Sequence, residues 1–185
     1  MWNRIVSVTV LCLAASAGAH AQSSAAPREL TAQDYIQIQQ LASRYARAID
    51  TCSNNGYDYA DLYTADGEFI PSFEGRQLPA IKGRERLAEV SGGGSRGCKN
   101  VGWIEQGVRH IYTNHIIEPT AEGATGTVDM LMIGLGGDPN KIQYDGYYED
   151  TYVRTPDGWR FARRVHHAIF RGGEQNQQQP ASQRN

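Results

Sequence analysis

The sequence from residue 109 to 117 reads Arg109-His110-Ile111-Tyr112-Thr113-Asn114-His115-Ile116-Ile117, and the fold is predicted outward from it. β-Branched and aromatic residues dominate this stretch and Glu118-Pro119 follows it, which indicates a β-strand. Side chains alternate along a strand, so we expect His110, Tyr112 and Asn114 on one face and His115 on the other. A titratable ring, a phenol and an amide on one face are typical of a strand that lines a pocket. The alternative is a half-buried strand whose polar face meets water.

The first 21 residues have the pattern of a secretory signal peptide. Arg4 supplies a positive start, residues 5–15 are apolar, and Ala19-His20-Ala21 is an A-x-A cleavage site. The apolar run is too short to span a bilayer. We therefore expect cleavage after Ala21 and a periplasmic or secreted protein with no membrane partner. The formal net charge of −2 shows no electrostatic footprint for nucleic acid.

Two cysteines, Cys52 and Cys98, remain after the predicted cleavage. An even pair in an oxidising compartment indicates a disulfide. Two free buried thiols are the alternative. Neither cysteine lies in a recognisable nucleophile motif, so we assign them no catalytic role.

A long amphipathic helix is predicted over residues 31–51. Thr31 followed by Asp34 forms a weak capping box, and apolar residues then recur at three- and four-residue steps. Asp50 falls in the last turn, at the edge of the apolar stripe. It is placed either to act as a base or the partner of a histidine, or to face solvent at a frayed helix end.

The remaining pattern predicts an α+β fold. Short helices are expected at 57–63 and 83–90, a turn at 64–67, a first strand at 68–72, and strands at 109–118, 124–134, 142–154 and 159–170. Helices followed by an antiparallel meander predict a curved, mainly antiparallel sheet wrapped around the long helix. We expect one domain at 30–171, after a polar leader at 22–29 and before a disordered, Gln-rich tail at 172–185.

Six segments carry a resemblance to a known family: residues 41–50, 59–69, 83–85, 109–114, 146–153 and 158–161. Their arrangement resembles the SnoaL-like branch of the nuclear transport factor two-like superfamily, which includes scytalone dehydratase, a bile-acid dehydratase and hexachlorocyclohexane dehydrochlorinase. The resemblance implies a cone-shaped barrel with a deep apolar pocket, and usually pairing of subunits through the sheet as a dimer or trimer. Non-catalytic subunits share this fold, so the fold does not fix the function.

Several of these enzymes use an acid on the first helix and a histidine on the strand, and Asp50 and His110 match those positions. Tyr45 matches a tyrosine of the dehydratases. Histidine is a base suited to neutral pH, and a carboxylate on its other ring nitrogen fixes the tautomer. The predicted catalytic residues are therefore His110, Asp50 and Tyr45. The predicted substrate-binding residues are Asn114, Tyr112, Tyr63 and Asp129.

Two of these assignments have alternatives. The Asp50–His110 pair is otherwise a core hydrogen bond without turnover, and Asp129 otherwise lies on a wet sheet face. His115 is expected on the convex face or in a subunit contact. At the last strand, one of His166 and His167 is expected to face the pocket, and Arg164 to pair with Asp150 or Glu149. The histidines lack metal-ligand spacing, so no metal or other cofactor is predicted.

Two functions follow from these residues. The first is a cofactor-independent lyase or isomerase acting on a small hydrophobic cyclic or aromatic molecule by β-elimination, dehydration or proton shift. The second is a non-catalytic ligand-binding or assembly module of the same fold.

Overall fold

A computed structural model describes residues 27–99, 101–134 and 142–169 of the chain. The predicted signal peptide, most of the leader and the Gln-rich tail lie outside these residues. Within them, no helix is long and apolar enough to cross a bilayer.

The helices precede most of the strands, as the sequence predicted. The helical elements are α1 (Ala32–Thr51), η1 (Ser53–Gly56), α2 (Tyr57–Ala60), α3 (Arg84–Val90), η2 (Gly94–Arg96) and α4 (Gly102–Glu105). The strands are β1 (Tyr63–Phe73), β2 (Arg76–Gln77), β3 (Ile81–Lys82), β4 (Arg109–Pro119), β5 (Gly123–Ile133), β6 (Ile142–Thr155) and β7 (Gly158–Ile169).

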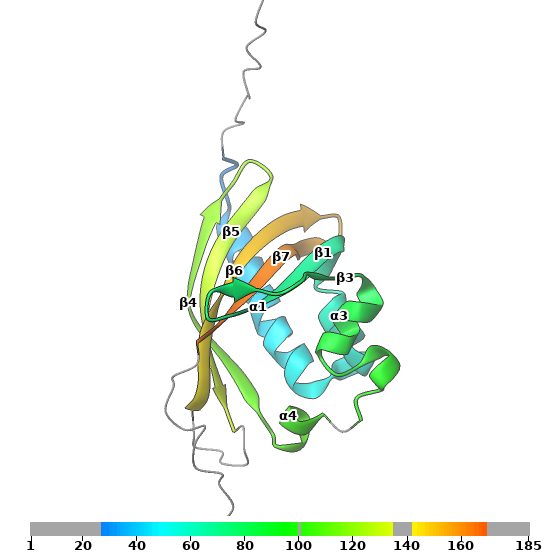
Figure 1. Cartoon of the computed structure of the whole chain (residues 1–185). Helices are drawn as coiled ribbons and strands as arrows, with labels where there is room; N and C mark the ends of the chain where they lie inside the picture. Colours follow the sequence, from blue (N-terminus) through cyan, green and yellow to red (C-terminus); the bar gives the residue numbers. More distant parts are fainter. Residues whose placement is uncertain (1–26, 100, 135–141, 170–185) are drawn as a thin grey trace, which may run out of the picture.

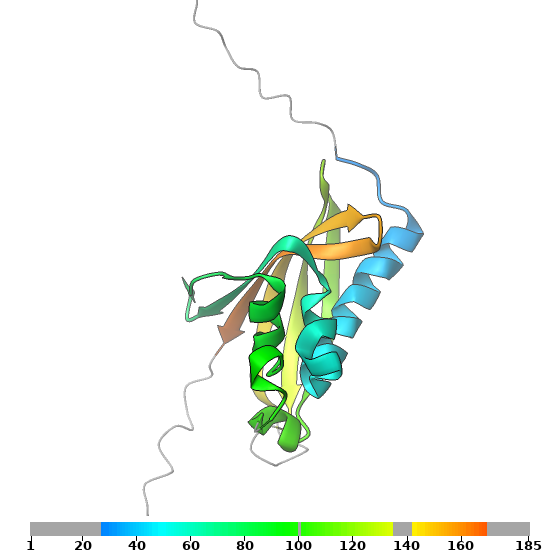
Figure 2. The ribbon, with the colours of Figure 1, turned by 90° about the vertical axis from the view of Figure 1, so that its right-hand side faces the viewer.

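One curved sheet contains all of these strands, in the order β2-β1-β7-β6-β5-β4, with β3 paired to β1. The pairs are antiparallel except β1–β7, which is parallel. Figures 1 and 2 show α1 and α3 on the same side of the sheet, with α1 running across it. This is the α+β cone that the sequence predicted, with the sheet unclosed.

The N-terminus of α1 is fixed by two kinds of contact. Thr31 is the N-cap and forms a capping box with Asp34, as predicted. Asp34 also accepts a hydrogen bond from Trp159 Nε1 at 3.0 Å and pairs with Arg154. The Thr31 hydrogen bonds, followed by that of Trp159, lower the pKa of Asp34 to about 2. The start of the helix is thereby joined to the β6–β7 hairpin.

The predicted turn at 64–67 is wrong. Those residues belong to β1, which begins at Tyr63, and the register between β1 and β7 shifts between Tyr63 and Glu68. A bulge of this kind keeps an irregular segment within a strand. The second helix is correspondingly short and ends at Ala60.

Candidate active site

Asp50 and His110 are in direct contact inside the cone. Asp50 Oδ1 lies 2.5 Å from His110 Nδ1, and the two side chains are only 3% and 4% exposed. The backbone N–H of His110 also points at the carboxylate, 3.1 Å from Oδ2 and 3.3 Å from Oδ1. An ionised carboxylate only accepts hydrogen bonds, so in the neutral imidazole this contact places the proton on Nδ1. The lone pair of Nε2 is then available to accept a proton.

The position of Asp50 follows from how α1 ends. Asp50 is in the last turn, and the C-cap Cys52 takes a left-handed conformation with φ 48°. Cys52 forms a disulfide with Cys98, which confirms the predicted pairing. The Cα atoms are 6.0 Å apart, within the usual range for a disulfide. The bond holds the end of α1 two residues beyond Asp50.

Arg164 of β7 is the largest fully buried side chain among the described residues. Its guanidinium carbon lies 3.9 Å from the ring centre of Tyr148, 4.0 Å from that of Tyr45 and 4.5 Å from that of Phe161. These separations fit cation–π contacts. Arg164 Nε also lies 3.2 Å from Asp150 Oδ1, which confirms the pairing predicted with Asp150. Within the described part of the chain, its three nitrogens have no hydrogen-bond partner of good geometry.

A chain of hydrogen bonds extends from Asp150 toward β4. Tyr152 donates its hydroxyl proton to Asp150 Oδ2 at 2.7 Å, and His115 Nε2 lies 3.0 Å from the same hydroxyl. Burial raises the pKa of Asp150 to about 6, partly offset by Arg164. Burial lowers the pKa of His115 to about 4, with Arg164 adding to the effect. His115 therefore points into the fold, and its predicted place on the convex face is wrong.

Asn114 lies away from the pair, contrary to the expectation that it shares a face with His110, and Asp129 takes its alternative place on an exposed sheet face. Asn114 Nδ2 donates to Asp129 Oδ2 at 2.8 Å, and both residues are exposed. Asn114 and His115 together face one residue of β5, because the β4–β5 register shifts between Thr113 and Ile116. This bulge reverses the alternation of side chains after Thr113.

The predicted tyrosines lie inside the fold but have different neighbours. The ring of Tyr112 is 6.5 Å from that of His110 and 5.6 Å from that of Tyr148. Tyr45, Tyr59 and Tyr63 form a chain of hydroxyls, with O–O distances of 3.3 and 3.1 Å. Burial raises the pKa of four phenols well above the usual value, those of Tyr45, Tyr59, Tyr63 and Tyr112. They therefore act as neutral groups at physiological pH.

His166 is the inward member of the His166–His167 pair. Its ring stacks on Tyr148 with the ring centres 4.8 Å apart. Burial, followed by the charges of Arg164 and His110, lowers the pKa of His166 to about 3. His167 instead bonds to Oε2 of the exposed Glu149 at 2.7 Å.

Arg164 and His166 were not among the predicted site residues. Each is next to a similar residue in the sequence, so the pairs Arg163-Arg164 and His166-His167 do not show which member faces inward. Simple alternation fails as well, because Thr151 pairs with Arg163 and Tyr152 with Phe161, which leaves Ala162 as an extra residue in β7. The contact of Arg164 with the rings of Tyr45 and Tyr148 follows from this shift of register.

The side chains of Asp50 and His110 are almost fully buried, and the ring of Tyr112 lies 6.5 Å from that of His110. Two hollows on the described part of the molecule open on the outer face of α1, and neither is lined by Asp50 or His110. No group of three or more potential metal ligands occurs among the described residues.

Comparison with known proteins places this fold in a family. The model of the SnoaL-like domain matches residues 30–165. An uncharacterized protein of Mycobacterium tuberculosis is 28% identical over 145 residues, which are 74% of this chain and 86% of the relative. A relative from Mycobacterium bovis matches to the same extent.

Solved structures from Novosphingobium aromaticivorans share the fold. An NTF2-like protein with a cystatin-like fold aligns with a TM-score of 0.60 and 22% identity, covering 77% of this chain and 85% of the other. A candidate scytalone dehydratase aligns with a TM-score of 0.54 and 21% identity, covering 75% and 85%. A candidate aromatic ring hydroxylase has the same score and identity, covering 77% and 93%. With the family model matched over most of its length, the chain belongs to the SnoaL-like family and has the NTF2-like cone fold.

Proposed function

We propose that this protein is a cofactor-independent lyase or isomerase acting on a small, mostly apolar cyclic or aromatic molecule. The observation that carries the proposal is the buried contact between Asp50 Oδ1 and His110 Nδ1 at 2.5 Å. A carboxylate at Nδ1 orients the imidazole and stabilises the imidazolium that forms when Nε2 takes up a proton. The candidate dehydratase among the fold neighbours is consistent with this chemistry.

The proposed reaction begins with transfer of a proton from a substrate carbon to His110 Nε2. The electron pair of the broken C–H bond forms a new C=C bond. In elimination, the leaving group departs from the adjacent carbon with the electron pair of its broken bond, either as halide, or as hydroxide that the His110 imidazolium protonates to water. In isomerisation, the same proton returns to a different carbon. A positioned general base contributes about 10²–10⁴-fold to such a step.

Arg164 is the proposed stabiliser of negative charge on a substrate oxygen. Its N–H groups have no hydrogen-bond partner among the described residues, and preorganised donors act strongly in a water-excluded site. Tyr45 would hold Arg164 in place through a cation–π contact, since its ring centre lies 4.0 Å from the guanidinium carbon. Tyr112 lies between His110 and Tyr148 and would contact the apolar body of the substrate. Tyr63 would fix Tyr59, and thereby Tyr45, through the hydroxyl chain.

Substrate entry requires side chains to move, because His110 and Asp50 are 4% and 3% exposed. This burial also favours the second candidate, a binding or assembly module without turnover. In that case the Asp50–His110 contact and the buried Arg164–Asp150 pair are parts of a polar core. The second candidate predicts ligand binding without product.

Two further proposals concern location and assembly. The Cys52–Cys98 disulfide supports export to an oxidising compartment, in keeping with the predicted signal peptide. Exposed isoleucines on the strands support association of copies through the sheet. These are Ile111, Ile116, Ile142 and Ile169.

Mass spectrometry of a substrate panel tests the enzymatic proposal. The panel contains cyclic secondary alcohols, cyclic halides and unsaturated ring ketones, incubated with wild-type protein and with His110→Ala, Asp50→Asn and His167→Ala. We expect loss of water or hydrogen halide, or a shifted double bond. His110→Ala is expected to lower the rate about 10²–10⁴-fold.

His167→Ala is the matched control, because His167 lies on the sheet but pairs with exposed Glu149. It is expected to keep its activity. Full turnover by a folded His110→Ala protein contradicts the proposed base. Saturable binding of panel members with no product supports the binding module instead.

A further inference from the structure

The outer face of α1 carries two arginines that the candidate active site does not use. Arg44 and Arg47 are exposed and one helical turn apart, where like charges repel each other. The positions four residues before and after them hold glutamine, alanine, serine and threonine, so α1 supplies no carboxylate at that spacing. Asp50, three residues after Arg47, is buried against His110. The helix therefore leaves both charges without an acidic partner of its own.

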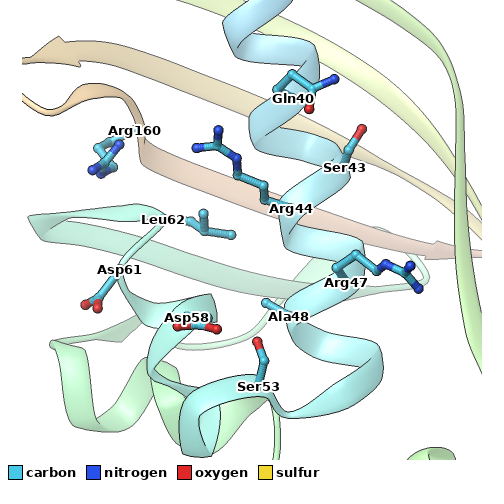
Figure 3. A pocket seen from close by; sticks show the side chains of 10 residues that line it. All are labelled: Gln40, Ser43, Arg44, Arg47, Ala48, Ser53, Asp58, Asp61, Leu62 and Arg160. Atoms are coloured by element: carbon cyan, nitrogen blue, oxygen red, sulfur yellow. The ribbon is translucent and has the colours of Figure 1, made fainter.

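A third arginine faces this surface from β7. Figure 3 shows Arg44 extending from α1 toward the side on which Arg160 lies. Arg160 NH1 donates to the carbonyl oxygen of its neighbour Trp159 at 3.0 Å, which restrains the guanidinium. No hydrogen bond or ion pair joins Arg44 or Arg160 to an acid within the described part of the chain. Two positive groups thus border one hollow without a bonded counter-charge.

Two acids, Asp58 and Asp61, line this hollow, and one of them is already paired with another arginine. Asp61 binds Arg84 through both oxygens, at 2.6 Å from Nε and 2.9 Å from NH2. Arg84 lowers the pKa of Asp61, with a smaller contribution from Arg160. Asp58 is exposed at the edge of the hollow. Arg44 and Arg160 therefore lie near one carboxylate of this hollow, Asp58, that no ion pair of the described residues engages, while Asp157 lines the adjoining hollow.

The hollow has the size of a small-molecule site. Its volume is about 470 Å³, and buried Ala48 and Leu62 contribute apolar surface to its wall (Figure 3). A second hollow of about 320 Å³ adjoins it and shares Gln40, Arg44 and Arg160 with it. Small-molecule pockets typically measure roughly 300–1,000 Å³. Arg44 and Arg160 border both hollows, where a charged group of a ligand would be within reach of both.

We propose that this hollow binds a small organic anion, whose carboxylate or phosphate lies between Arg44 and Arg160. Guanidinium groups match the oxygen spacing of both head groups and form charge-assisted hydrogen bonds with them. Arg47 lines the rim but extends to the other side of α1 (Figure 3), and the apolar body of the ligand would rest on Ala48 and Leu62. Asp58 disfavours a second anionic group at the opposite end. Neither Asp50 nor His110 lines this hollow, so the proposed site is separate from the proposed catalytic pair.

Calorimetric titration of the purified chain with three probes tests the site. Benzoate and phenyl phosphate carry the two head groups on the same ring, and benzyl alcohol is their uncharged counterpart. All titrations are made at one ionic strength, balanced with sodium chloride. We expect saturable binding of at least one anion and none of benzyl alcohol. Binding of benzoate alone identifies a carboxylate site, and binding of phenyl phosphate alone identifies a phosphate site.

Matched variants locate the binding. Arg44→Gln with Arg160→Gln is expected to weaken it at least about tenfold, since two charge-assisted contacts are lost. Arg86→Gln removes an exposed arginine of α3 that pairs with Glu89, and it is expected to leave affinity within about twofold. Thermal melting verifies that each variant is folded. The proposal is overturned if neither anion saturates, if the double variant binds like wild type, or if Arg86→Gln weakens binding equally.

Discussion

Arg164 combines full burial with a positive charge, and its surroundings explain how the fold tolerates it. Asp150 supplies the counter-charge at 3.2 Å, and the rings of Tyr45 and Tyr148 lie against the guanidinium. Removing a charge from water costs several kcal/mol, and a partner at close range offsets much of that cost. The pair is therefore expected to matter most when only one member is removed.

We predict that Asp150→Ala lowers the free energy of unfolding by about 3–5 kcal/mol, because it leaves the Arg164 charge buried without its partner. Adding Arg164→Met to Asp150→Ala is expected to recover much of this loss. Urea denaturation of the single and double variants measures both effects. Glu149→Ala, at the adjacent exposed residue, is the control and should change stability by less than about 1 kcal/mol. A double variant less stable than Asp150→Ala contradicts the proposed role of the charge.

At the scale of elements, the bulge in β4 determines which histidine joins which network. Asn114 has a φ of 52°, in the left-handed region, and the bulge ends the alternation that began at His110. As a result, both histidines point into the fold. His110 contacts Asp50 from the segment before the bulge, and His115, within the bulge, contacts Tyr152. Strict alternation would have turned His115 away from the core.

We predict that Asn114→Val is less stable than Asn114→Gly by about 1–2 kcal/mol. A β-branched residue is strained at a positive φ, whereas glycine adopts it freely. Both variants lose the hydrogen bond to Asp129, so their difference isolates the backbone effect. Chemical denaturation measures it. Equal stability of the two variants would mean that the bulge moves or disappears without cost.

Most of the regular elements were predictable, because hydrophobic periodicity and turn residues act locally. The helix at 31–51 and the four strands from residue 109 onward were confirmed within one or two residues. The irregular segment at 64–67 was not, since pairing with β7 holds it in β1. The short elements β2, β3 and α4 were missed because two to four residues carry too little pattern.

At the scale of the whole molecule, the Cys52–Cys98 disulfide connects the end of α1 to the segment before β4. The two cysteines are 46 residues apart in sequence. The loop between them contains α2, β1 and α3. Cross-linking a loop of this length limits the freedom of the unfolded chain more than that of the folded one.

We predict that Cys52→Ser with Cys98→Ser lowers the free energy of unfolding by about 2–4 kcal/mol, through the greater freedom of the unfolded chain. Guanidinium denaturation of the variant and of wild type measures the change. Thiol titration of the denatured, unreduced protein without residues 1–21 provides the control and should detect no free thiol. Two free thiols per chain would contradict the disulfide.

The sequence alone determined the α+β class, the long first helix, the order of the main strands, the cysteine pair and the residues Asp50 and His110 as candidates. These features depend on local periodicity, on spacing, or on resemblance to a family. The tertiary structure decided that Asp50 and His110 touch, that Arg164 and His166 face inward, and that Asn114 and Asp129 face outward. Two bulges and the pairing of distant strands set those positions, and a shift of one residue exchanges the faces of a strand.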